Sequence, residues 1–307
     1  MRLLAAGLLA TALGAGAQEV TLTTASAPRD ATFRADRQAL AIRCADRTVQ
    51  LYDLPGGSKR ATLGPVAEGT SMVRLSADGR VVATAGERPE LELWDAATGK
   101  SLRRSPLAGH AYSLSLSSDG ARVAAGNADA EVVLWDGAAE KRLPLGGEAQ
   151  DLAFSPDGSL LAAAGADALV RVFHVPDGRL VATLDDAVHS QFALAFSPDG
   201  RRLASVGADG SARVYDTAGW KTVSRTAAGR IPGAAIGFHG AGEVFAVFVP
   251  VAPGPRPTWL RWNLATGAEE RGELPAGARI LGGSSDGQLV AIADGDRVRV
   301  TALPRPR

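Results

Sequence analysis

Four histidines are the residues of this sequence best suited to acid–base catalysis or to metal binding, because imidazole titrates near neutral pH and is a common metal ligand. They are His110, His174, His189 and His239. None of them stands in a metal-ligand spacing such as His-Glu-x-x-His. The sequence therefore predicts no metal site.

The other candidate groups are a carboxylate pair, one cysteine and a series of aspartates in turns. Asp185 and Asp186 are adjacent, but adjacency does not set the separation that an acid–base pair needs, so a solvated surface pair is the alternative. Cys44 is the only cysteine, and its position in a predicted strand favours a buried thiol over a nucleophile. The turn aspartates occur once per repeat, whereas a calcium site needs several ligands on one ion.

Two further features of catalytic and nucleotide-binding proteins are missing. The sequence contains no glycine-rich phosphate loop, and its one Gly-x-Ser-x-Gly stretch, residues 283–287, falls in a repeat turn between two predicted strands and not in the strand-to-helix turn of a nucleophile elbow. We therefore expect no catalytic residue and no cofactor.

A unit that recurs along the chain must position these residues. Residues 192–219, FALAFSPDGRRLASVGADGSARVYDTAG, contain three apolar runs that are separated by Ser-Pro-Asp-Gly and Ala-Asp-Gly turns. The first-turn aspartate recurs every 38 to 45 residues, at Asp36, Asp78, Asp119, Asp157, Asp199 and Asp286, with Ala241 in its place in one copy. A period of ~40–45 residues with four strands per unit is typical of propeller blades.

A second set of residues supports this alignment of the repeats. An aromatic residue and a polar one follow the aspartate by 16 residues in five copies: Tyr52-Asp53, Trp94-Asp95, Trp135-Asp136, Phe173-His174 and Tyr215-Asp216. The apolar runs are too short for helices and are rich in Val, Leu, Ala and aromatics, which favours strands. The sequence predicts an all-β fold, a seven-bladed β-propeller of four-stranded blades.

Several motifs carry a family resemblance. Ser-Pro-Asp-Gly at 155–158 and 197–200, Leu-Trp-Asp at 93–95 and 134–136, and Asp-Ala-Ala-Thr-Gly-Lys at 95–100 resemble those of WD-repeat β-propellers, in particular the exported bacterial type. The resemblance covers roughly residues 19–303 and implies a scaffold for protein–protein interaction. Ala125 stands where the third blade would usually carry Ser or Thr, so the buried His–Ser/Thr–Asp–Trp network of the family is not expected there.

The N-terminus has the three parts of a secretory signal peptide. Residues 1–17, MRLLAAGLLATALGAGA, combine an early Arg2, an apolar core and a small-residue cleavage pattern. We expect export to the periplasm or outside the cell, with a mature propeller domain over residues 18–307 and no membrane span. Because the seventh repeat lacks its outer strand, we predict that residues 20–24 supply it and close the ring.

The predicted face of blade-linking loops holds the candidate binding residues. In the sixth repeat, four prolines between residues 250 and 257 predict a rigid loop, and Arg256 and Trp259 are its residues most typical of binding patches. Packing of Trp259 between blades is the alternative. His110 and His189 fall in loops of the same predicted face.

The balance of basic and acidic residues indicates which class of partner the protein binds. Lys and Arg together number 33, as do Asp and Glu, and no basic run occurs, which argues against nucleic acid as a partner. We expect an exported, non-enzymatic and monomeric scaffold for a protein partner. The alternatives are an exported enzyme or small-ligand binder that uses the mouth of the central channel, and a component of an outer-envelope assembly.

Overall fold

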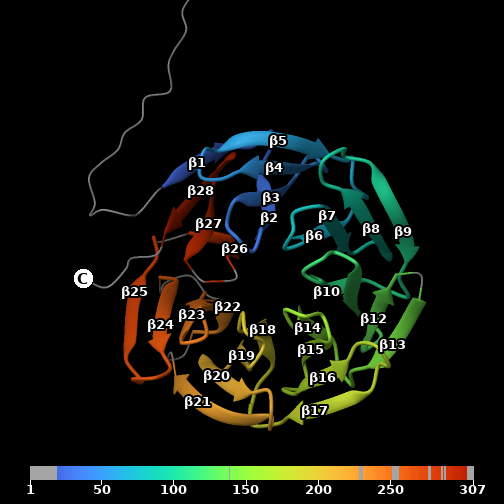
Figure 1. The fold of residues 1–307 in the computed structure, drawn as a ribbon. Coiled ribbons are helices and arrows are strands. Elements are labelled where there is room, and N and C mark those ends of the chain that lie inside the picture. Colours follow the sequence, from blue (N-terminus) through green and yellow to red (C-terminus); the bar gives the residue numbers. More distant parts are fainter. Residues whose placement is uncertain are drawn as a thin grey trace, which may run out of the picture.

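A ring of small sheets forms the fold of this chain (Figure 1). The computed structural model describes residues 19–137, 139–227, 231–250, 256–275, 278–284, 286 and 288–302, and the predicted signal peptide lies outside them. Within the described residues, 28 strands form seven antiparallel sheets of four strands each. The structure confirms the prediction of a seven-bladed β-propeller.

Six blades consist of four strands that follow one another in the chain. Blades 1 and 2 contain β2 (Pro28–Phe33), β3 (Ala39–Cys44), β4 (Val49–Asp53), β5 (Ser58–Leu63), β6 (Thr70–Leu75), β7 (Val81–Gly86), β8 (Glu90–Asp95) and β9 (Ser101–Pro106). Blades 3 and 4 contain β10 (Ala111–Leu116), β11 (Arg122–Asn127), β12 (Glu131–Asp136), β13 (Ala139–Pro144), β14 (Ala149–Phe154), β15 (Leu160–Gly165), β16 (Val170–His174) and β17 (Leu180–Leu184). Blades 5 and 6 contain β18 (Gln191–Phe196), β19 (Arg202–Gly207), β20 (Ser211–Asp216), β21 (Lys221–Ala227), β22 (Gly233–His239), β23 (Glu243–Phe248), β24 (Thr258–Asn263) and β25 (Glu269–Glu273).

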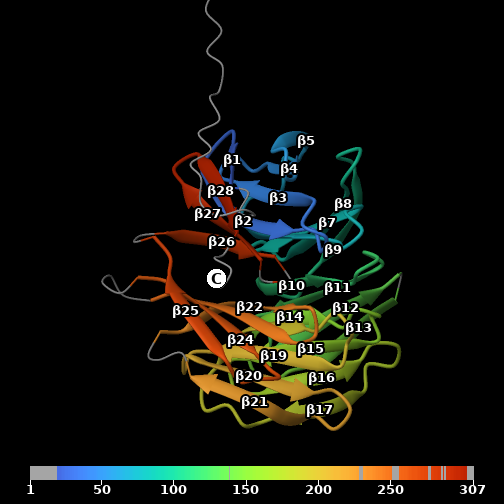
Figure 2. The ribbon, with the colours of Figure 1, turned by 60° about the vertical axis from the view of Figure 1, so that its left-hand side comes forward.

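Blade 7 joins the two ends of the described chain. It contains β26 (Arg279–Gly283), β27 (Leu289–Asp294), β28 (Arg297–Ala302) and, as its outer strand, β1 (Val20–Thr23). β1 pairs antiparallel with β28, and both views show the two strands side by side (Figures 1 and 2). Leu22 is buried among residues of blades 1 and 7. The prediction that the segment near residue 20 closes the ring is confirmed.

The core lies between neighbouring blades, because both faces of each inner strand are covered. In β15, for example, residues 161–165 are all buried. The separate apolar clusters each combine residues of adjacent blades, such as Leu134 of β12 with Phe154 of β14. This explains why the sequence of the second strands is almost continuously apolar rather than alternating.

Each regular first turn is stabilised by a buried serine and the repeat aspartate. In blade 4, Ser155 Oγ donates to Asp157 Oδ1 at 2.5 Å and accepts the N–H of Leu160 at 2.9 Å. Gly158 follows with φ +70°, a left-handed conformation that glycine adopts without steric cost. The predicted Asp-Gly turns therefore work as expected in the regular blades.

The tryptophans of blades 2 and 3 differ in one hydrogen bond. Trp94 Nε1 donates to Thr84 Oγ1 at 3.1 Å. Trp135 occupies the equivalent place in blade 3, where Ala125 offers no acceptor, and its buried Nε1 has no hydrogen-bond partner among the described residues. The expected gap in the family network is present.

The lone thiol is buried in the seam between blades 1 and 7. Cys44 is fully buried and packs in the cluster that contains Leu22, Val298 and Val300. Burial raises the pKa of the Cys44 thiol to about 11, so the reactive thiolate is scarce at neutral pH. The expected structural role of this cysteine agrees with its position.

Two general features of the described residues bear on function. They contain no helical segment with the length and hydrophobicity that a membrane-spanning helix requires. Among the same residues, no group of three His, Cys, Asp or Glu side chains is placed as metal ligands would be.

Candidate functional site

The loops of the ring form two opposite faces. The entry face, as we call it, consists of the loops that lead into each blade and the turns between second and third strands. In six blades of the described structure a backbone N–H of that turn donates to a carbonyl of the entry loop, at 2.9 to 3.1 Å: Ala45 to Ala27, Glu87 to Gly69, Ala128 to His110, Ala166 to Glu148, Ala208 to Ser190 and Val249 to Pro232. The hairpin face consists of the two remaining turns of each blade. The entry face is therefore a set of loops held by the blades beneath them.

His110 and His189 both lie on the entry face, as predicted from the sequence. Each side chain is exposed, and His110 precedes β10 whereas His189 precedes β18. Blade 4 lies between their two blades in the ring (Figure 1). The structure thus places the two imidazoles on one face without joining them in one site.

Arg256 and Trp259 have different environments. Trp259 is only 5 % exposed, and its ring stacks on Phe245 at a centroid distance of 6.4 Å in a cluster that includes Val290 of blade 7. It packs between blades, which is the alternative that the sequence left open. Arg256 is exposed and pairs with Glu273 at 3.2 Å. Residues 251–255 of the predicted loop lie outside the described residues.

Three of the charged side chains on the innermost strands, Asp30, Arg74 and Asp151, interact around the axis of the ring. Arg74 Nη1 of β6 is 3.3 Å from Asp30 Oδ2 of β2, and the charge of Arg74 also acts on Asp151 of β14. Burial raises the pKa of Asp30 and raises that of Asp151 to about 6.

Each of these aspartates bridges its blade to the next one. Asp30 Oδ2 accepts the N–H of Val73 at 2.7 Å, and Asp151 Oδ2 accepts the N–H of Leu194 at 2.8 Å. Both carboxylates are thereby bonded to the backbone of a neighbouring innermost strand. Their geometry is that of blade-to-blade contacts.

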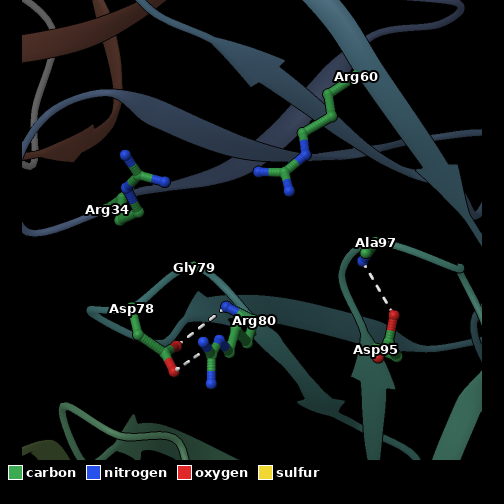
Figure 3. A pocket seen from close by; sticks show the side chains of 7 residues that line it. All are labelled: Arg34, Arg60, Asp78, Gly79, Arg80, Asp95 and Ala97. Carbon is green, nitrogen blue, oxygen red and sulfur yellow. Dashed lines mark hydrogen bonds and ion pairs between the residues drawn. The ribbon is translucent and has the colours of Figure 1, made fainter.

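A cleft with a volume of about 370 Å³ lies between blades 1 and 2 on the hairpin face. It is lined by Arg34, Arg60, Asp78, Gly79, Arg80, Asp95 and Ala97. Figure 3 shows Arg60 extending into the gap from above, Arg34 at its left, the turn with Asp78 and Arg80 below and Asp95 at its right. Three guanidinium groups from three different elements therefore surround one space.

The two carboxylates of the cleft are engaged in their own turns. Asp78 Oδ1 accepts Ser76 Oγ at 2.6 Å and the N–H of Arg80 at 2.9 Å. Asp95 Oδ1 accepts the N–H and the hydroxyl of Thr98, and these hydrogen bonds lower the pKa of Asp95. Their charges are thus partly compensated by local donors.

Arg34 takes the place of a serine. Five other repeats have Ser two residues before the repeat aspartate, at Ser76, Ser117, Ser155, Ser197 and Ser284. Arg34 replaces the serine as the donor to the aspartate, with two hydrogen bonds of 2.6 Å from Nε and Nη2 to Asp36. Its chain lies against Gly79, where an added Cβ would be 2.7 Å from Arg34 Cδ. Glycine at position 79 therefore allows Arg34 to reach the cleft.

A β-bulge directs Arg60. The pairing of β4 with β5 shifts between Leu51↔Ala61 and Tyr52↔Lys59, so Arg60 is the extra residue. Bulges change the direction of a side chain relative to a regular ladder. Arg60 is exposed and makes no ion pair with any other described residue.

Sequence reasoning missed this cleft. The replacement of a repeat serine by Arg34 is a signal that the aligned repeats contain. The position of Arg60 also recurs, because blades 2, 4 and 5 have the same bulge, but only the pairing of β5 with β4 shows that the residue there is a bulge.

Comparison with known families agrees with the repeat structure. Residues 99–136, 147–174 and 178–216 match the family model described as WD domain, G-beta repeat. The first and third matches each begin near the outer strand of one blade and run through three strands of the next, the same offset that makes β1 part of blade 7. No curated protein matches the chain.

Proposed function

Because the chain is a WD-repeat β-propeller, we propose that it is an exported, non-enzymatic scaffold that binds a protein partner through its entry face. The fold suggests a role in protein–protein interaction in general. Blade packing supplies the stability of such a ring, which leaves the loops free to carry recognition residues. We propose that the protein acts as a monomeric propeller, with neither a cofactor nor a nucleic-acid partner.

Exposed apolar side chains beside the two histidines carry this proposal. Tyr112 is 46 % exposed two residues after His110, and Val188 is 70 % exposed directly before His189. Large exposed apolar side chains at fixed loops are typical of protein-binding surfaces. The backbone bond from Ala128 to the His110 carbonyl, at 3.1 Å, holds the first of these loops in place. Two places on the entry face thus present a histidine beside an exposed apolar side chain, with Tyr112 at the start of β10 and Val188 in the loop before β18.

The geometry around the axis also favours a scaffold over a channel-mouth enzyme. A general acid or base must reach the substrate, whereas Asp30 and Asp151 are bonded to backbone N–H groups of the next blades. The third charged group, Arg74, is paired with Asp30. This arrangement supports a structural use of all three.

Export is proposed from the composition of residues 1–17 alone. Intact-mass measurement of the protein from its native source tests it. Cleavage after Ala17 is the expected result, and an uncut Met1 in the functional pool would contradict export by this route.

The test of the scaffold changes the entry face without disturbing the core. A protein with Tyr112→Ala and Val188→Ser, compared with wild type, is cross-linked in the native extract and its captured proteins are identified. Leu180→Ser is the matched control, because Leu180 is equally exposed at 46 % but lies on the outer strand β17. We expect the double variant to lose a partner that the control retains. Capture of the same proteins by all three would exclude the entry face as the binding surface.

A further inference from the structure

We propose that the cleft between blades 1 and 2 binds a carboxylate-bearing segment of a polypeptide, through Arg60 and Arg80 with support from Arg34. This site lies on the hairpin face and is separate from the entry face of the proposed function. The lining residues are Arg34, Arg60, Asp78, Gly79, Arg80, Asp95 and Ala97 (Figure 3).

The guanidinium groups retain unused donors. Arg60 has no ion-pair partner among the described residues, and Arg80 contacts Asp78 Oδ2 only at 3.8 Å with 85 % of its side chain exposed. Arg34 uses Nε and Nη2 for Asp36, which leaves Nη1 beside Gly79. A guanidinium carries five N–H donors in a fork that matches a carboxylate. The cleft therefore offers bidentate binding to an anion.

Two departures from the repeat lie at this seam. The turn of blade 1 would be satisfied by a serine in place of Arg34, as the other first turns show. At the bulge of the outer strand, blades 2, 4 and 5 carry Leu102, Val181 and Val223, whereas blade 1 carries Arg60. The fold requires an arginine at neither position. Two arginines that the repeat does not need thus line the same cleft.

The charge balance favours a carboxylate over a phosphoryl group. Asp78 and Asp95 lie in the same lining, and they repel a dianion more strongly than a monoanion at equal distance. The volume of about 370 Å³ suits a few side chains of a peptide rather than a folded domain. A backbone N–H or a lysine of the same segment can bind the free oxygen of Asp95. The ligand class that fits is a short polypeptide segment containing Asp or Glu.

Fluorescence anisotropy with a labelled hexaglutamate peptide tests the proposal on the whole protein. Arg60→Glu and Arg80→Glu should each weaken binding by about tenfold or more, because each replaces charged donors to the peptide's carboxylates with a group that repels them. Arg201→Glu is the matched control, because Arg201 occupies in the first turn of blade 5 the position that Arg80 has in blade 2. Binding to the control should stay within about twofold of wild type. Arg60→Lys should lose part of the affinity, because an ammonium group lacks the fork.

Three results would overturn the inference. They are no measurable binding of hexaglutamate, equal loss in the Arg80 and Arg201 variants, and stronger displacement of the peptide by inorganic phosphate than by acetate at equal ionic strength. The first two exclude the cleft as a carboxylate site, and the third assigns it to phosphoryl groups. None of them affects binding at the entry face, so failure here is distinguishable from failure of the scaffold.

Discussion

Blades 1 and 4 each contact the next blade of the ring through an equivalent aspartate, but their first turns differ. Asp30 and Asp151 occupy the same place in the innermost strand, and each accepts a backbone N–H of the next blade. Blade 4 has Ser155 and Gly158 in its first turn, whereas blade 1 has Arg34 and, at a positive φ of 63°, Arg37.

This difference distinguishes residues that stabilise the ring from residues that the ring accommodates without needing them. An arginine at positive φ is strained relative to glycine, yet Arg37 is retained and pairs with Asp286 of blade 7 at 2.9 Å. Arg34 lies at the opposite seam, against blade 2. The first turn of blade 1 therefore directs a charged side chain toward each neighbouring blade.

Within this comparison of blades 1 and 4, the largest expected effect comes from the serine of blade 4. Ser155→Ala removes two hydrogen bonds in a buried turn and should lower the free energy of unfolding by about 2 kcal/mol. Arg34→Ser, the corresponding change in blade 1, should alter it by less than about 0.5 kcal/mol, because serine is the residue that this turn normally uses. Urea unfolding of both variants and wild type measures the two changes in the free energy of unfolding. An equal loss in both would show that Arg34 is a structural residue and would break the comparison.

A smaller effect is expected from the two aspartates, and it depends on pH. The folded-state pKa of Asp151 is about 6, above the ordinary value of 3.8, so the folded protein holds a proton that the unfolded chain releases. The resulting stabilisation is present at pH 4 and is lost as the pH rises through 6.

Asp151→Asn removes this titration and can keep an oxygen acceptor for the N–H of Leu194. Its melting temperature should match that of wild type at pH 4 and exceed it by roughly 2 °C at pH 8. Asp30→Asn should gain less, because it also deprives Arg74 of its partner at 3.3 Å. Thermal unfolding of both variants and wild type at pH 4 and pH 8 tests this. A gain in melting temperature that is larger at pH 4 than at pH 8 would contradict the upward pKa shift.

The fold was predictable because its determinants repeat. Turn residues such as Asp157 and Gly158 recur at a fixed period and are local in their effect, so they set blade number and strand order. The closing strand followed from counting, since the seventh repeat lacked an outer strand.

The candidate site was harder to predict from the sequence, because it depends on contacts between blades. His110 and His189 could be assigned to a face from their place in the repeat. Whether Trp259 packed or protruded depended on blade 7, and the direction of Arg60 depended on a bulge in its pairing with β4. The exchange of a repeat serine for Arg34 was visible in the sequence, but the strand pairing that directs Arg60 toward the same space was not, so the cleft could not be predicted.

Closure of the ring by β1 is the central claim, and the single thiol reports on it. Cys44 is buried beside Leu22 of β1, Val298 and Val300, so any opening of this seam exposes it. Labelling of Cys44 by a thiol reagent under native conditions should be negligible in wild type. Leu22→Ala should label at least tenfold faster, since loss of a buried leucine costs about 2–5 kcal/mol. Immediate labelling of the wild-type thiol, or equal rates in the two proteins, would contradict a ring closed by its N-terminal strand.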